Sequence, residues 1–147
     1  MELKEGIRAS YLADGLSEEY LDIVCGIARE EYREDLSEIV RQDDPSRDLY
    51  VLLEGKAMVQ SSLGDFIGRM KPGGLFGEVA LFDARPRSAT VSADGPVKLA
   101  VIPAEALNAL IDERPEMGVL ILRNLGRVLC ERLRSSNFQV EAIILAL

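Results

Sequence analysis

Two ionisable residues lie nine positions apart (87 − 78) near the middle of the chain, among glycines and apolar residues. Glu78 follows a glycine-rich turn, and Arg87 precedes a β-branched segment. A guanidinium donates two parallel charge-assisted hydrogen bonds to a phosphate, whereas a carboxylate accepts hydrogen bonds from sugar hydroxyls. A cavity lined by both side chains would therefore suit a sugar phosphate.

The segment around Glu78 also predicts a local anion site. Residues 72–82, PGGLFGEVALF, place glycines before several good helix formers, which predicts a helix of one or two turns. The first N–H groups of such a helix have no helical partner. Another interpretation stays open, in which Glu78 and Arg87 form a structural ion pair in a fold that binds nothing. A buried Arg87 needs a partner in either case, and Glu78, Asp83 or a solvent anion are candidates.

The composition excludes several classes of protein. The net charge is −8, from 25 acidic and 17 basic residues, which argues against DNA as a partner of this chain alone. The absence of histidine removes the commonest general base and metal ligand, so we expect no catalytic residues, no metal and no metal cupin enzyme. Cys25 and Cys130 lie far apart and in apolar contexts, which predicts buried free thiols.

Neither end of the chain suggests a membrane protein. The first residues contain no apolar run of signal-peptide length, and the longest apolar run, VEAIILAL, is too short to cross a bilayer. We therefore expect a cytoplasmic protein that does not enter a membrane.

The periodicity of apolar residues predicts one α+β domain over residues 1–147. A helix is expected from Leu16 to about Arg29, with Ser17 as its N-cap. Short alternating segments fill residues 30–102 and predict an antiparallel sandwich or barrel. Residues 103–147 are predicted to be helical, with breaks near Pro103 and Pro115. The turns expected between the strands lie at 43–45, 54–56, 64–65 and 94–96.

The last predicted helix carries apolar residues three or four positions apart. We expect one part of this stripe to pack on the barrel and its continuation to meet a second copy of the chain, giving a homodimer. The stripe consists of Leu122, Leu125, Leu129, Leu133, Val140, Ile144 and Leu147.

A longer motif carries a family resemblance. FGEVALFDARPRSATV, residues 76–91, resembles the phosphate-binding cassette of the cyclic nucleotide-binding domain, as found in catabolite activators and kinase regulatory subunits. SEIVRQDDPSRDLYVLLEGKAMV and IPAEALNALIDERPEM are similar to other parts of that domain, so the resemblance covers about Leu16 to Arg134. It implies a jelly-roll barrel, a double-stranded β-helix, flanked by an N-terminal helix and C-terminal helices. Asp43 stands where the family often has glycine, which alters a turn and not the pocket.

The resemblance also implies roles for individual residues. Glu78 would accept a hydrogen bond from the ribose 2′-hydroxyl, and Arg87 would pair with the exocyclic phosphate oxygens. Backbone amides of Ala80 and Ser88 would complete the phosphate cradle, and Gly77 would let the chain pass close to the ligand. The ligand-binding residues implied in this way are Gly77, Glu78, Val79, Ala80, Arg87 and Ser88.

The function implied is that of a non-catalytic sensor without a cofactor. Ser88, in place of the threonine that would favour a guanine amino group, predicts cAMP rather than cGMP as the ligand. The C-terminal helix would then pass the signal to an effector protein that the sequence does not identify. The alternative is a ligand-free module with the same fold that dimerises and docks a partner protein.

Overall fold

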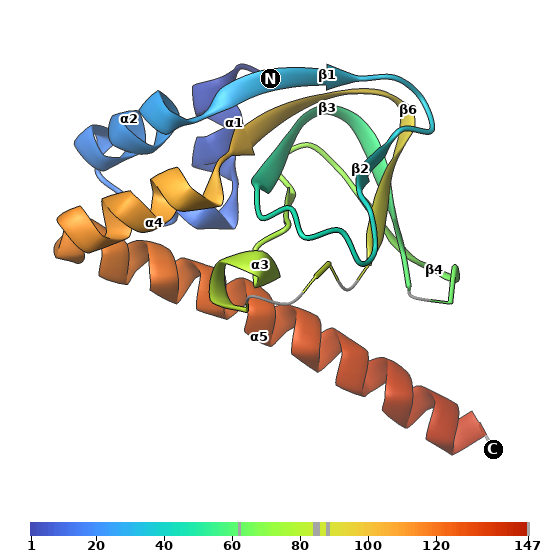
Figure 1. Cartoon of the computed structure of the whole chain (residues 1–147). Coiled ribbons are helices and arrows are strands. Elements are labelled where there is room, and N and C mark those ends of the chain that lie inside the picture. The colour runs from blue at the N-terminus through green and yellow to red at the C-terminus, as the bar shows by residue number, and fades with distance from the viewer. Residues whose placement is uncertain (62, 84–85, 88, 147) are drawn as a thin grey trace.

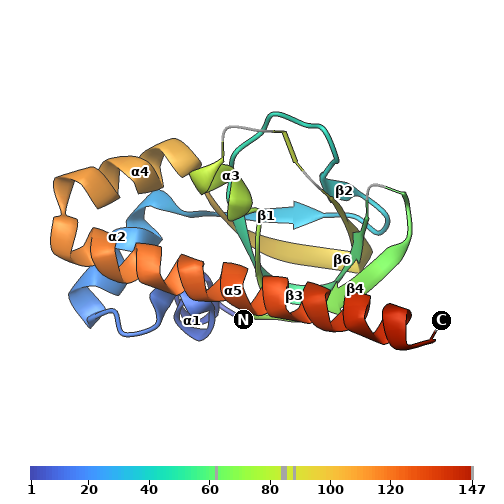
Figure 2. The same cartoon turned by 90° about the horizontal axis from the view of Figure 1, so that it is seen from below.

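The computed structural model describes residues 1–61, 63–83, 86–87 and 89–146, with the backbone alone described for Ala80 and residues 136–146. An antiparallel sheet is flanked by helices that gather at one end of it, and the longest helix runs beneath (Figures 1 and 2). The helices are α1 (Leu3–Ala9), the 3₁₀ helix η1 (Tyr11–Ala13), α2 (Glu18–Ile27), α3 (Val79–Phe82), α4 (Ala104–Glu113) and α5 (Pro115–Ala146). The strands are β1 (Arg29–Arg33), β2 (Glu38–Val40), β3 (Leu49–Gln60), β4 (Phe66–Met70), β5 (Leu75–Phe76) and β6 (Thr90–Ile102).

The two long strands β3 and β6 form the centre of the sheet. Among the described strands, β1 and β2 pair along the outer edge of β6, and β4 and β5 pair along the outer edge of β3. All of these ladders are antiparallel, which confirms the prediction. The predicted closure into a barrel is wrong, because no ladder between described strands joins the β1 edge to the β4 edge.

Two of the predicted turns lie inside these long strands. Residues 54–56 lie opposite residues 94–98, where the register of the β3–β6 ladder shifts. Gly55 and Gly95 have φ values of +90° and +83° there. A Cβ atom on Gly55 would lie 2.5 Å from the carbonyl oxygen of Pro96. The glycines therefore bend paired strands instead of ending them, as β-bulges do.

Alternate residues of β3 serve two cores. Leu49, Val51 and Leu53 are buried against the helices, whereas Tyr50 and Leu52 are buried in the second core on the other face. The ring of Tyr50 stacks on that of Phe76 from β5, with 5.1 Å between the ring centroids. This stacking fixes β5, and the turn that follows it, against the sheet.

The N-terminal segment was predicted in part. Ser17 caps α2 as expected, since its hydroxyl accepts a hydrogen bond from the Tyr20 N–H at 3.2 Å. Helix α1 and η1 were not predicted. Their burial depends on Ile7 and Leu12, which pack against distant strands and helices and show no periodicity of their own.

Asn124 joins α5 to this N-terminal segment. Its side chain is 1% exposed, and its amide donates to the carbonyl oxygens of Leu12 at 2.9 Å and of Asp14 at 2.7 Å. Arg127 donates to Asn124 Oδ1 at 2.9 Å and to Asp14 Oδ2 at 2.9 Å. We call this set of bonds the Asn124 clamp. It fixes the first half of α5 to η1.

The stripe predicted on the last helix does not divide along its length as expected. Of the predicted residues, Leu125 is buried against the sheet, whereas Leu122 and Leu133 are 38% and 62% exposed on the outer side. Residues 136–146, which include the predicted Val140 and Ile144, have no described side chains, and Leu147 lies outside the described residues. The residues of α5 that pack on the core are Met117, Ile121, Leu125 and Val128.

The two cysteines differ in burial. Cys25 is half-buried, but Cys130 is exposed on α5, so the prediction of two buried thiols is wrong for Cys130.

Among the described residues, none of the helices combines the length and apolar character needed to span a bilayer.

Candidate functional site

The turn that begins the site requires glycine. Strand β5 pairs with β3 and ends at Phe76, and the next residue, Gly77, has a φ of +86°. A Cβ atom there would lie 2.7 Å from the carbonyl oxygen of Asp48 and 3.1 Å from Arg87 Nη1. A larger residue would therefore strain the backbone and displace Arg87. Glu78 follows with helical backbone angles and leads into the four-residue helix α3, which confirms the short helix predicted there.

Arg87 is held by backbone groups of the loop between β2 and β3. Its N–H donates to the carbonyl of Asp44 at 3.0 Å, and its carbonyl accepts from the N–H of Asp43 at 2.9 Å. Asp43 has a φ of +67°, in the left-handed region that glycine adopts most readily. The guanidinium donates from Nη1 to Gly77 O at 2.9 Å and from Nη2 to Asp48 O at 2.7 Å. The carbonyl groups of Gly77 and Asp48 therefore hold the Arg87 side chain in one orientation.

The electrostatics of Arg87 follow from its burial. The residue is 6% exposed. Burial lowers the pKa of its guanidinium, whereas the electrostatic interactions with Tyr50 and Asp48 raise this pKa. Carbonyl oxygens bind its two Nη atoms. The interpretation in which Glu78 and Arg87 form a structural ion pair is wrong, because the carboxylate of Glu78 pairs with a different arginine.

That second arginine is Arg132 on α5. Its Nη1 donates to Glu78 Oε1, and its Nη2 donates to the carbonyl oxygen of Leu75. Glu78 is fully buried, whereas 44% of the Arg132 side chain is exposed. Among the described residues, Glu78 Oε2 and Arg87 Nε are buried without any hydrogen-bond partner. The site thus contains one unused acceptor and one unused donor.

Glu78 and Arg87 both line a cavity of about 700 Å³, which we call the Glu78 cavity. This volume lies within the range of small-molecule sites, about 300–1,000 Å³. Of the residues predicted from the resemblance, Gly77, Glu78, Val79 and Arg87 line the cavity. The side chain of Ala80 is not described, and Ser88 lies outside the described residues, as does Arg85.

Strands and the last helix also contribute to the walls of the Glu78 cavity. Strand β3 contributes Val59, strand β4 contributes Ile67, and α5 contributes Arg132 and Ser135. The walls therefore combine apolar side chains with a few polar groups, the usual composition of a small-molecule site. Among the described residues there is no group of three or more His, Cys, Asp or Glu residues placed to hold a metal ion.

Two residues of the site were not predicted from the sequence. The backbone carbonyl of Asp48 orients Arg87, and the carboxylate of Glu78 pairs with Arg132. A signal for it existed: the buried positions Ile121, Leu125 and Val128 continue at helical spacing to position 132, so a charged residue stands on the buried face of α5.

A bent antiparallel sheet whose cavity presents a carboxylate and a guanidinium defines a domain for binding a small polar molecule. The sequence model of the family described as the cyclic nucleotide-binding domain matches residues 30–114, more than half of the chain. The chain therefore belongs to the cyclic nucleotide-binding domain family, which confirms the resemblance.

Curated relatives share this region within longer proteins. Glutaminase 2 of Bradyrhizobium diazoefficiens is 31% identical over 105 residues, which are 71% of this chain and 17% of the relative. A CRP-like cAMP-activated global transcriptional regulator of Mycobacterium tuberculosis is 28% identical over 110 residues, 72% of this chain and 47% of the relative. The chain thus spans less than half the length of either relative.

Solved structures agree with the fold. A cyclic nucleotide-binding domain from Methylobacillus flagellatus has a TM-score of 0.85 at 24% identity, over 95% of this chain and 83% of that one. The catabolite activator protein of Thermus thermophilus has a TM-score of 0.79 at 29% identity, over 91% of this chain and 63% of that one.

Proposed function

We propose that the chain is a non-catalytic sensor that binds a cyclic nucleoside monophosphate, cAMP in preference to cGMP, in the Glu78 cavity. The observation that carries this proposal is the pair of unpartnered atoms in the cavity walls, Glu78 Oε2 and Arg87 Nε. A ribose hydroxyl can donate to the carboxylate oxygen, and a phosphate oxygen can accept from the guanidinium. Cyclic nucleotides contain both groups at a short, fixed separation.

The energetics favour such a ligand. A buried polar group without a partner costs about 1–3 kcal/mol, so a ligand that satisfies both atoms removes two such penalties. The apolar side chains of Val59, Ile67 and Val79 offer surface for the sugar and the base. The choice of cAMP rests on Ser88 in the sequence and on similarity to a regulator described as cAMP-activated.

In this proposal the signal leaves through α5. This helix contributes Arg132 and Ser135 to the cavity, and Arg132 already holds one oxygen of Glu78. A ligand hydroxyl on the other oxygen, and a phosphate nearby, change the charges that Arg132 experiences. The position of α5 therefore affects ligand affinity, and by the same coupling the ligand favours one position of α5.

The test combines three nucleotides with one variant. At a ligand concentration 100 times Kd, cAMP should stabilise the fold by about 2.7 kcal/mol, a rise in Tm of about 5–10 °C. We expect less stabilisation by cGMP and none by 5′-AMP. Arg87→Ala should cost about 2–5 kcal/mol of cAMP affinity by calorimetry. The exposed Arg41, which pairs only with Glu38 among the described residues, provides the matched control Arg41→Ala. Tight binding by folded Arg87→Ala would contradict the proposal.

One observation favours a second candidate function, the ligand-free interaction module. Arg87 has two carbonyl partners and Glu78 has Arg132, so the site has internal partners for both charges. For this candidate we expect no thermal shift with either cyclic nucleotide, from protein shown to be folded and free of copurified nucleotide.

Both candidates treat residues 1–147 as one cytoplasmic domain that forms a homodimer through α5 and acts on an effector protein, not on DNA. Support for the dimer comes from the outer face of α5. Val119, Leu122 and Leu133 are exposed there and Leu129 is half-buried, at spacings typical of a two-helix seam.

A further inference from the structure

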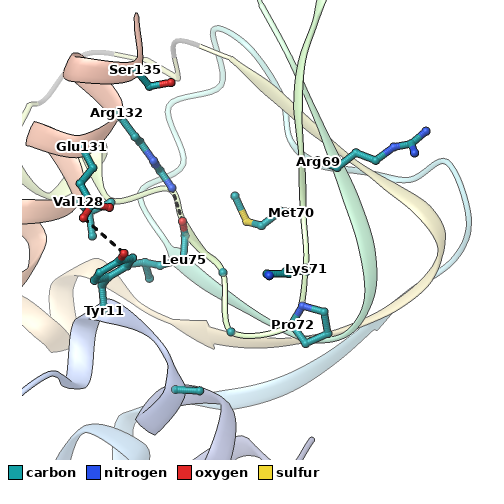
Figure 3. A pocket seen from close by; sticks show the side chains of 13 residues that line it. Tyr11, Arg69, Met70, Lys71, Pro72, Leu75, Val128, Glu131, Arg132 and Ser135 are labelled. Carbon is teal, nitrogen blue, oxygen red and sulfur yellow. Dashed lines mark hydrogen bonds between the residues drawn. The ribbon is translucent and has the colours of Figure 1, made fainter. Parts of the chain in front are cut away.

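A second cavity, of about 480 Å³, lies where the N-terminal helices, the loop between β4 and β5, and α5 meet (Figure 3). We call it the Tyr11 cavity. It shares Arg69, Met70, Arg132 and Ser135 with the Glu78 cavity, and its other lining residues are different. Tyr11, Lys71, Leu75 and Val128 are among the residues that belong to it alone.

Two hydrogen bonds fix the α5 side of the Tyr11 cavity. The hydroxyl of Tyr11 donates to Glu131 Oε1 at 3.4 Å, and Arg132 donates to the carbonyl oxygen of Leu75 (Figure 3). Glu131 and Arg132 are therefore both held by groups of this chain. Buried Leu75 and Val128, with half-buried Met70, supply apolar surface beside them.

Lys71 differs from the other charged residues of this cavity. It is exposed, and no ion pair joins its ammonium to another described residue. Arg69, in contrast, has an ion pair with Asp94 at 3.7 Å, and its guanidinium points away from the cavity (Figure 3). Although the chain has a net charge of −8, a cation without an ion pair beside an apolar surface attracts anions locally.

We propose that the Tyr11 cavity binds a small organic anion, with a phosphate or carboxylate group at Lys71 and an apolar body of about one ring against Leu75, Val128 and Met70. The volume suits a molecule of that size. Lysine binds either anionic group as a point charge, and the apolar wall adds affinity only for a ligand with a hydrophobic part. This site does not depend on nucleotide binding in the Glu78 cavity.

The test uses phenyl phosphate and benzoate as probes, with benzyl alcohol as the neutral control. Amide signals of Gly73 and Gly74, which line the Tyr11 cavity, report binding there by ¹H–¹⁵N NMR, and that of Gly77 reports the Glu78 cavity. We expect saturable shifts at Gly73 and Gly74 with at least one anion, with a Kd of about 1 mM or lower. Benzyl alcohol should bind at least about fivefold more weakly. The anion that binds more tightly identifies the preferred head group.

Lys71→Gln should raise the Kd of the preferred anion at least about fivefold, because it removes the charge and keeps most of the side chain. Lys56→Gln is the matched control, since Lys56 is exposed and lines neither cavity. An equal loss in both variants would overturn the proposal, as would the absence of saturable shifts at about 10 mM. Shifts confined to Gly77 would overturn it too, because the probes would then occupy the other cavity.

Discussion

The pairing of Arg132 with Glu78 predicts a specific cost for the variant Arg132→Ala. Among the described residues, Arg132 is the only cation within ion-pair distance of the fully buried Glu78 carboxylate, whose second oxygen has no partner. Removing Arg132 therefore leaves a buried carboxylate without an ion-pair partner among the described residues. The fold should become less stable even though no apolar core residue is changed.

The loss of stability expected for Arg132→Ala lies between two limits. Breaking a fully buried ion pair costs about 3–5 kcal/mol, whereas an exposed pair contributes about 0–1 kcal/mol. Since 44% of the Arg132 side chain is exposed and Glu78 is buried, we expect an intermediate loss, about 2 kcal/mol in the free energy of unfolding. For a domain of this size the corresponding fall in Tm is about 4–8 °C.

A double-mutant cycle measured by urea unfolding tests this explanation. Glu78→Gln removes the negative charge, so Arg132→Ala should cost less than about 0.5 kcal/mol in the Glu78→Gln background. Arg134→Ala is the matched control, because Arg134 is an exposed arginine two positions away on α5. If Arg132→Ala destabilised both backgrounds equally, the ion pair would not be the source of its effect, and the reasoning would be refuted.

The remaining predictions concern pH and assembly. Burial raises the pKa of Tyr50 above its ordinary value of 10.0, so its contribution to stability is complete below that pH and is lost as pH rises through the folded-state pKa. In urea unfolding, Tyr50→Phe should therefore lose less stability than the wild type between about pH 9 and pH 11. Equal losses of stability in the two proteins would show that ionisation of Tyr50 does not cause the loss. Leu133→Glu should convert the proposed dimer to a monomer in analytical ultracentrifugation, because Leu133 is 62% exposed on the outer face of α5. Leu63→Glu, at a residue 86% exposed in the hairpin between β3 and β4, should leave the mass unchanged; a dimeric Leu133→Glu would place the contact elsewhere.

The part of the site that sequence predicts well is the part encoded locally. Gly77 and Glu78 are adjacent, and the short helix after them follows from the residues that form it. Ser17 caps α2 because its hydroxyl reaches an N–H only three positions away. Such features depend on spacing within one or two turns of chain, so the sequence contains most of the information needed.

Contacts between distant segments were the part that sequence could not supply. Arg132 lies 54 positions after Glu78 (132 − 78), and its place in the site depends on how α5 crosses the sheet. Turns were predicted at Gly55 and Gly95, because a bulge and a turn both favour glycine at positive φ. Only the pairing of β3 with β6 on both sides of them distinguishes the two cases.

The Asn124 clamp gives α5 the mechanics of a lever. The helix is continuous over 32 residues, from Pro115 to Ala146, and the clamp fixes it to η1 near its first third. From Asn124 to Ala146 the helix extends about 33 Å, at about 1.5 Å per residue. A tilt of about 10° at this pivot would move the far end by about 6 Å, whereas Arg132, about 12 Å from the pivot, would move about 2 Å. A displacement of atomic size beside Glu78 thus becomes, at the end of the helix, a movement as large as a side chain.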